Sequence, residues 1–357
     1  MRAFVAAVLV LVLVAPTVPA AAAKKPTRVQ KLARSLVAAH APGAIVVVRT
    51  PTRTRSGVAG AAQLQPRVAM KANMHFRIAS VTKTFVATVV LQLVGEGKLA
   101  LDDSIERWLP GLVPNGSAIT VRELLSHTSG LFNYTDDLGW QNAVIANPGQ
   151  EWSPRDLLAI AFSKPPLFAP GTNWSYSNTN YIVLGLMLEA ITGEPVANVL
   201  KERIFDPLAL RATSFPTGIA MDEPFTHGYL SFQGSLVDLA PILNPSWGYA
   251  AGQIVSTAAD VTKFLAALLG GKLLSPALMT QMQAGSPSSG VYGLGIRTTF
   301  SGCGRVYGHD GSFFGWRNEA FATANGRRAA VVMVNVDDSR VGNGTLEGAV
   351  MAAVCTG

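Results

Sequence analysis

Ile78-Ala79-Ser80-Val81-Thr82-Lys83-Thr84-Phe85 is the stretch around which the rest of this chain can be interpreted. A serine and a lysine three residues apart stand before a mostly apolar run, residues 86–94, that contains neither proline nor glycine. We expect a buried helix that begins near Ser80. The spacing of three then places the Ser80 hydroxyl and the Lys83 amine on one helical face, about one turn apart.

This pair of side chains has a possible chemistry. Burial disfavours the charged form of a lysine, and a neutral amine can take the proton of a neighbouring hydroxyl and so create a nucleophile. The alternative is an ordinary helix start, with Ser80 as the cap and Lys83 as a surface charge. Because an isolated Ser-x-x-Lys is usually such a helix start, a catalytic site requires further residues elsewhere in the chain.

The first residues have the pattern of a secretory signal peptide. Arg2 is followed by an apolar stretch over 3–15 and an alanine-rich segment over 20–23, which predicts a signal peptide at 1–23. A membrane anchor is the weaker alternative, because a spanning helix needs about 20 apolar residues. We therefore expect a secreted protein, extracellular or associated with the cell wall, with no membrane span.

The composition favours a compact globular protein. The 357 residues are 49% hydrophobic and 14% charged, and the net charge is +7. Because the basic residues are scattered, we expect no nucleic-acid partner. Two cysteines and five histidines without metal-ligand spacing predict no metal, and we expect no cofactor. An even cysteine count in an exported protein suggests a disulfide between Cys303 and Cys355.

The distribution of strand and helix patterns predicts an α+β fold. Strands are expected near both chain ends, with a hairpin turn at Asn325-Gly326, and short helices fill the middle of the chain. This order predicts one mainly antiparallel sheet built from both ends and flanked by helices, with a mainly helical subdomain inserted. The predicted boundaries are 24–97 and 248–357 for the sheet subdomain and 98–247 for the helical one, together forming one catalytic unit. The expected strands cover 44–49, 57–60, 293–299, 305–308, 315–323 and 328–336, and a closing helix covers 345–354.

Two further polar clusters accompany Ser80 and Lys83. Tyr176-Ser177-Asn178 precedes a predicted helix, and Tyr176 suits acid–base work if nearby cations lower its pKa. The second cluster, 307–312, reads Tyr-Gly-His-Asp-Gly-Ser. Its histidine adds a group that can titrate near neutral pH, and its two glycines let a ligand approach the backbone closely. The alternatives are a capped helix start with a packing tyrosine and a hairpin turn with an exposed histidine and aspartate.

The ordered set Ser-x-x-Lys, Tyr-x-Asn and His-x-Gly resembles the serine β-lactamase and penicillin-binding protein superfamily. It is most similar to the secreted D-alanyl-D-alanine carboxypeptidases of the actinobacterial type. The resemblance covers nearly the whole mature chain and implies a β-lactamase/transpeptidase-like fold. Further segments that resemble this family are 91–99, 124–131, 176–181 and 292–297.

The resemblance implies a role for each matching residue. Ser80 would be the nucleophile, Lys83 the amine beside it, and Tyr176 the phenol that exchanges protons with that lysine. Backbone N–H groups of Ser80 and Ser312 would form the oxyanion hole. The residues implied in substrate binding are Asn178, Trp247, Arg297, His309, Gly311 and Ser312. His309 would keep a cation or donor where many relatives have lysine. For Trp247 and Arg297 a core tryptophan and a strand-edge arginine remain the alternatives.

One position departs from the carboxypeptidase pattern. Asp310 stands where that branch has a threonine or serine whose hydroxyl helps to bind the substrate carboxylate. Two carboxylates facing one another repel. Either Asp310 turns toward His309 or Arg297, or the substrate differs. In the second case esters, amides with a cationic tail and D-amino-acid amides become candidates.

The expected function is acyl transfer through an acyl-enzyme on Ser80. The first prediction is a penicillin-sensitive D-Ala-D-Ala carboxypeptidase, a monomer whose partner is a peptidoglycan stem peptide or a β-lactam. The alternatives are a β-lactamase, an esterase or D-amino-acid amidase on the same scaffold, and a non-catalytic penicillin-binding homologue. A Ser-His-Asp hydrolase is disfavoured because the chain has no Gly-x-Ser-x-Gly elbow.

Overall fold

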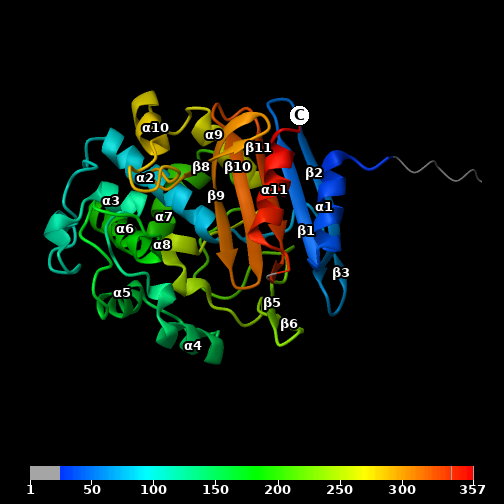
Figure 1. Ribbon diagram of the computed structural model, residues 1–357, viewed down its shortest axis with the longest axis horizontal. Coiled ribbons are helices and arrows are strands. Elements are labelled where there is room, and N and C mark those ends of the chain that lie inside the picture. The colour runs from blue at the N-terminus through cyan, green and yellow to red at the C-terminus, as the bar shows by residue number, and fades with distance from the viewer. Residues whose placement is uncertain (1–24, 339, 357) are drawn as a thin grey trace, which may run out of the picture.

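The computed structural model of the protein describes residues 25–338 and 340–356. The predicted signal peptide, 1–23, lies outside the described residues. A seven-stranded antiparallel sheet has the order β3-β2-β1-β11-β10-β9-β8, with helices α1 and α11 on one face and the helix-rich region on the other (Figure 1). Its strands are β1 (Gly43–Arg49), β2 (Thr54–Gln63), β3 (Val68–Ala69), β8 (Arg297–Ser301), β9 (Gly304–Phe313), β10 (Trp316–Thr323) and β11 (Ala329–Val334).

The sheet joins the two ends of the chain. β1 pairs with β11 along its whole length, from Ala44 opposite Val334 to Arg49 opposite Ala329, and every β11 residue is buried. Such continuous apolar strands are typical of a sheet covered on both faces. The predicted α+β class, with an antiparallel sheet from both ends flanked by helices, is therefore confirmed.

Helices cover the sheet on both sides and form the region between its strands. A separate core packs under α1 and α11, and a larger one fills the space around α2. The helices are α1 (Arg28–Ala38), α2 (Thr82–Gly95), α3 (Val121–Ser126), α4 (Leu138–Ala146), α5 (Pro154–Phe162), α6 (Asn178–Thr192), α7 (Val196–Leu200), α8 (Tyr249–Gly252), α9 (Ala258–Leu269), α10 (Pro276–Gln283) and α11 (Asn343–Val354).

Short strands connect the helix-rich region to the rest of the fold. β5 (Tyr229–Phe232) and β6 (Ser235–Asp238) form a hairpin, and β5 also pairs in parallel with β12 (Val336–Asp337). β4 (Phe76–Arg77) pairs with β7 (Val255–Ser256). The region 98–247 is therefore not purely helical, and the proposed subdomain boundaries stay a prediction.

Several elements differ from the sequence prediction. Helix α1 was not expected, and β8 begins at Arg297 rather than at residue 293, because Gly295 has a left-handed backbone with φ of +71°. β9 continues to Phe313, where the prediction ended at 308. His309 and Asp310 consequently lie in a strand, with His309 opposite Ala320, and the alternative of a hairpin turn there is wrong.

Helix α2 lies in the middle of the larger core and positions the Ser-Lys pair. It begins at Thr82, after a 3₁₀ turn formed by Ala79–Val81. Phe85 stacks on Phe264 with ring centroids 3.6 Å apart. Lys83 has 0% exposure, so the alternative of a surface charge is wrong.

Candidate active site

Ser80 is held in a strained and closely packed turn. Its neighbour Ala79 has φ of +52°, a left-handed conformation that is unfavourable for a residue with a Cβ. Strand β9 packs against this turn so closely that a Cβ at Gly311 would overlap the carbonyl oxygen of Ile78. Gly311 therefore makes room for the turn that carries Ser80. The sequence had suggested that this room serves a ligand.

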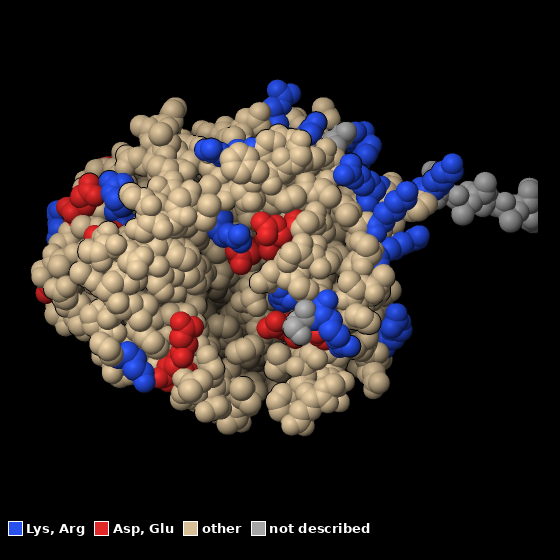
Figure 2. Space-filling model, viewed as in Figure 1, with Lys and Arg blue, Asp and Glu red and all other residues tan. Residues whose placement is uncertain are grey.

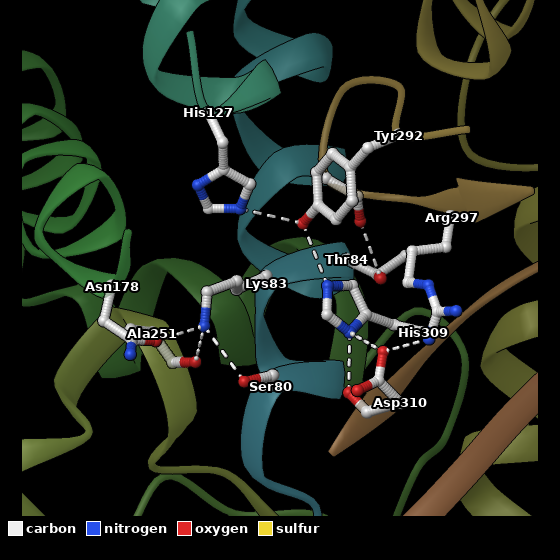
Figure 3. A network of polar contacts seen from close by, with 11 residues as sticks. Ser80, Lys83, Thr84, His127, Asn178, Ala251, Tyr292, Arg297, His309 and Asp310 are labelled. Atoms are coloured by element: carbon white, nitrogen blue, oxygen red, sulfur yellow. Dashed lines mark hydrogen bonds and ion pairs between the residues drawn. The ribbon is translucent and has the colours of Figure 1, made fainter. Parts of the chain in front are cut away.

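The amine of Lys83 points at three oxygen atoms (Figure 3). Its Nζ lies 2.7 Å from Oδ1 of Asn178, 2.7 Å from the carbonyl oxygen of Ala251 and 3.1 Å from Oγ of Ser80. Burial lowers the pKa of Lys83 well below its ordinary value, although the carboxylate of Asp310 opposes this shift.

When Lys83 is neutral, its nitrogen has one lone pair, which can accept a hydrogen bond from the Ser80 hydroxyl. The amide oxygen of Asn178 and the carbonyl of Ala251 can only accept hydrogen bonds, so they take the two N–H groups of the neutral amine. The remaining partner, the Ser80 hydroxyl, can donate to the nitrogen lone pair. This arrangement is what a lysine general base requires.

The amide of Asn178 is fixed by its own neighbours. Its Nδ2 donates to Thr135 Oγ1 at 3.1 Å and to Asn133 Oδ1 at 3.3 Å. Its backbone N–H donates to the same Asn133 oxygen at 2.9 Å. These bonds turn the Asn178 oxygen toward Lys83.

Tyr176 is a neutral phenol. Burial raises its pKa well above the ordinary value, while a hydrogen bond with the Ser80 side chain acts in the opposite direction. Lys83 Nζ lies 4.9 Å from the centre of the Tyr176 ring. The expectation that cations lower this pKa is not met, because burial outweighs the effect of the Ser80 hydrogen bond. A phenol of this kind can donate a proton to a departing group.

His309 belongs to a buried chain of hydrogen bonds. Nδ1 of His127 accepts from the backbone N–H of Ser177 at 3.2 Å and lies 3.1 Å from Nδ2 of Asn180, so its Nε2 carries the proton. That Nε2 lies 3.1 Å from the Tyr292 hydroxyl, which lies 2.9 Å from Nε2 of His309. His127 therefore donates to Tyr292, and Tyr292 donates to His309.

The same chain fixes the state of His309. Its Nδ1 donates to the backbone oxygen of Asp310 at 2.6 Å, and burial lowers the pKa of His309 to about 4. His309 is consequently neutral at neutral pH, with both ring nitrogens engaged. The expectation of a cation or donor for the substrate is not met, because burial keeps the ring neutral and Tyr292 and Asp310 engage its two nitrogens.

Asp310 forms an ion pair with Arg297, the arginine that was expected to bind a substrate carboxylate. Arg297 donates from Nη1 to Oδ1 of Asp310 at 2.5 Å, and the same oxygen lies 3.6 Å from Nδ1 of His309. Burial alone would raise the pKa of Asp310, but His309 and Arg297 outweigh burial and lower it. Asp310 thus turns toward both neighbours, and its carboxylate is charged.

Trp247 and Ser312 line the same pocket as Asn178. Trp247 is buried, stacks on Phe313 with ring centroids 4.0 Å apart, and has no hydrogen-bond partner on Nε1 among the described residues. It lines a pocket of about 400 Å³ that reaches the site. The pocket is lined by Thr135, Trp140, Gln141, Ile145, Asn178, Trp247, Ser312, Phe314 and Asp337. Its aromatic walls suit an apolar side chain.

Most of the predicted site residues lie together, but the two cysteines lie apart from them. Cys303 and Cys355 form a disulfide with Cα atoms 5.5 Å apart, which joins the end of α11 to the β8–β9 hairpin. The site also contains residues that the sequence prediction missed: Thr135, Asn133, Ala251, Tyr292, His127 and Glu319. His127 and Tyr292 stand in segments already noted as family-like, and Glu319 is an acid inside a buried strand.

The part of the chain that the structure describes can be compared with the requirements of a metal site and of a membrane span. Within 25–338 and 340–356 no group of three or more His, Cys, Asp or Glu side chains could hold a metal ion. In the same ranges no single helix has the length and apolarity to cross a membrane. One pair bent by 83°, Asn178–Thr192 with Val196–Phe205, passes that test by length and composition.

A lysine-activated serine beside a neutral tyrosine defines a serine hydrolase site of the Ser-x-x-Lys class. The beta-lactamase family model matches residues 29–352, so this chain belongs to the beta-lactamase family. The chain is 30% identical over 269 residues to PbpX of Bacillus subtilis, a protein provisionally named as a penicillin-binding protein. It is also 30% identical over 310 residues to a D-aminopeptidase of Brucella canis.

Two solved structures that are similar to this chain are an amidohydrolase and an amidase. A D-stereospecific amidohydrolase from Streptomyces sp. has a TM-score of 0.81 and 35% identity, covering 90% of this chain and 98% of that one. The D-amino acid amidase of Ochrobactrum anthropi SV3 has a TM-score of 0.81 and 26% identity, covering 90% and 94%. This chain spans only 65% of PbpX and 56% of the Brucella D-aminopeptidase.

Proposed function

We propose that this protein hydrolyses amides or short peptides of D-amino acids through an acyl-enzyme on Ser80. The D-Ala-D-Ala carboxypeptidase expected from the sequence is the less supported function. The observation that carries the proposal is the ion pair between Arg297 and Asp310, at 2.5 Å. A terminal carboxylate would have to displace Asp310 from the arginine and then lie beside a second negative charge.

Each step of the reaction has a residue in position. Lys83 takes the proton of Ser80 as the oxygen attacks the carbonyl carbon. The neutral phenol of Tyr176 then protonates the departing nitrogen and recovers its proton from Lys83. Backbone N–H groups of Ser80 and Ser312 would stabilise the oxyanion. Water then gives a proton to Lys83 as it attacks the acyl-enzyme, and Lys83 returns that proton to the Ser80 oxygen as the acid is released.

The pocket beside Trp247 supports an apolar acyl group. It opens next to Asn178, and its walls include Trp140 and Phe314. A structure of the Ochrobactrum amidase was determined with D-phenylalanine, which has an aromatic side chain of suitable size. We therefore extend the proposal to aromatic or large aliphatic D-amino acids. We also propose that the protein is secreted and acts as a monomer.

The test compares D-phenylalanine amide with an N-acylated D-Ala-D-Ala peptide, using purified protein and Ser80→Ala as the inactive control. We expect turnover of the amide and little of the peptide. The variant Asp310→Thr should improve the peptide relative to the amide, because it frees Arg297. Efficient turnover of the peptide by the wild type would contradict the proposal.

Reaction with a labelled penicillin, followed by intact mass, separates the remaining alternatives. A long-lived adduct on Ser80, together with peptide turnover, would restore the carboxypeptidase. Rapid release of hydrolysed drug would indicate a β-lactamase. A protein that forms no adduct and hydrolyses no amide or ester would be a non-catalytic homologue.

A further inference from the structure

Tyr176 and the pocket beside Trp247 together indicate where the leaving group of the substrate lies. Tyr176, the proton donor for that group, lies beside His309, with ring centroids 6.3 Å apart. In Figure 3, Asn178 and His309 lie on opposite sides of Ser80, and Asn178 lines the pocket that we assign to the acyl group. The leaving group therefore departs toward His309 and its neighbour Asp310.

This part of β9 is an edge that a substrate can reach. β8 pairs with β9 only along Gly304–Gly308, and no other described strand pairs with His309–Phe313 on that side. Asp310 lies at this edge with a side chain that is 45% exposed. Its charge influences the pKa values of both Lys83 and Tyr176, so it lies within electrostatic range of the reacting groups.

Two more carboxyl groups stand behind Asp310. Glu319 on β10 is directly opposite Asp310 in the strand register, and it is 5% exposed with no hydrogen-bond partner on Oε2 among the described residues. Glu347 lies on α11, which packs against β8 and β10, and its charge raises the pKa values of both Glu319 and Arg297. Figure 2 shows acidic side chains gathered beside basic ones near the middle of this face, next to a hollow.

The basic groups nearby are already engaged. Arg297 is paired with Asp310. Arg317, which also influences Glu319, donates to the backbone oxygens of Asp338 and Val341 and to the side chain of Asn343. Glu319 keeps its proton at neutral pH, because burial and the charge of Asp310 raise its pKa to about 8, and its buried Oε2 has no hydrogen-bond partner among the described residues. A cation placed beside it would favour the ionised carboxylate.

We propose that Asp310, Glu319 and Glu347 form a subsite for a positively charged leaving group, one that carries an ammonium or guanidinium a few bonds beyond the scissile nitrogen. This inference rests on the proposed function and adds the charge of the leaving group to it. An ammonium has three donors and no acceptor, so it supplies the donor that Glu319 lacks and pairs with a charged Asp310. A leaving group with a carboxylate meets repulsion from the charged Asp310.

The test uses three D-phenylalanine anilides that differ only in the para substituent: aminomethyl, hydroxymethyl or carboxymethyl. A methylene separates each charge from the ring, so the leaving nitrogens stay chemically similar. We expect kcat/KM to fall from the cationic to the neutral to the anionic anilide, with the outer two differing by at least about tenfold at low salt. Salt should reduce this ratio.

Variants identify the groups responsible. Asp310→Asn and the double variant Glu319→Gln/Glu347→Gln should each lower the cation-to-anion ratio several-fold. Asp102→Asn is the matched control, since Asp102 forms a similar aspartate–arginine pair with Arg122 at 2.7 Å, outside the site, and should leave the ratio unchanged. The corresponding phenyl esters repeat the comparison where amide cleavage is slow.

The possible results separate the two proposals. Turnover of all three anilides at equal rates would overturn the cation subsite and leave the amide hydrolase standing. A charge preference among the esters without any amide turnover would support the subsite and contradict the proposed amide substrate. A preference for the anionic compound would overturn the subsite, and equally fast cleavage of the N-acylated D-Ala-D-Ala peptide would overturn both.

Discussion

Nζ of Lys83 lies 2.7 Å from Oδ1 of Asn178, and the amide at that position is neutral. The Lys83 amine must be unprotonated to act as a base, so kcat/KM should rise with pH through its pKa and then level off. Because burial lowers the pKa of Lys83 well below 10.5, this rise should occur well below pH 10.5. A change in charge at Asn178 should therefore move the rise.

Asn178→Asp tests this relationship. A carboxylate beside Lys83 favours the protonated amine, so the rise in kcat/KM should move about one to two pH units higher. The measurement is the pH profile for an ester with a neutral leaving group. Asn178→Leu is the control, which removes the amide without adding charge and should show no upward shift. Identical profiles for wild type and Asn178→Asp would show that Lys83 is not the base.

The requirement for Tyr176 should depend on the leaving group. Its phenol is neutral and close to Ser80, so we assign it the proton that an amide nitrogen needs on departure. Tyr176→Phe should slow amide hydrolysis by about 10² to 10⁴ and slow an activated ester, whose leaving group needs no proton, much less. The measurement is kcat/KM for a D-phenylalanine anilide and for its nitrophenyl ester. Equal losses on both substrates would contradict this role.

The local pattern of the sequence predicted the buried helix that carries Lys83 and follows Ser80, since a long apolar run without proline or glycine favours such a helix. It also predicted the strands that join the chain ends, because β1 and β11 are apolar on both faces. The segment 309–312 was harder to predict. Its glycine and polar residues resemble a turn, and only the pairing of β9 with β10 makes it a strand.

The same limit applies to the chemistry of the site. The residue types at 80, 83 and 176 could be read from the sequence, but their protonation depends on burial, which distant elements create. Tyr176 was expected to have a lowered pKa and instead has a raised one. Asp310 was an anomaly until the structure showed its ion pair with Arg297.

Gly311 should be required for packing around the nucleophile. A Cβ at this position would overlap the carbonyl oxygen of Ile78, two residues before Ser80. We expect Gly311→Ala to destabilise the protein by about 1–3 kcal/mol and to lower acylation of Ser80, because the turn must move. Gly302→Ala in the β8–β9 hairpin is the matched control, since a Cβ there would meet no atom within 4 Å. Urea unfolding and the rate of acylation by an ester measure both effects, and equal stability of the two variants would contradict the packing argument.

Glu319 should make the protein less stable as the pH rises. Burial and the charge of Asp310 raise its pKa to about 8, so between pH 4.5 and 8 the folded protein keeps a proton that the unfolded chain loses. The free energy of unfolding should fall across this window, by about 4 kcal/mol for a shift of this size.

Glu319→Gln removes that dependence, because the amide stays neutral at every pH. The variant and the wild type should have similar stability near pH 4.5, where the carboxyl is protonated in the folded protein and half-protonated in the unfolded chain. Near pH 8.5 the variant should be more stable by about 4 kcal/mol, the size of the same shift. Urea unfolding at a series of pH values measures the difference, with Asp102→Asn as a control for loss of a remote carboxylate. A difference that is constant with pH would show that Glu319 is charged throughout, and the carboxyl behind Asp310 would then be better solvated than its 5% exposure indicates.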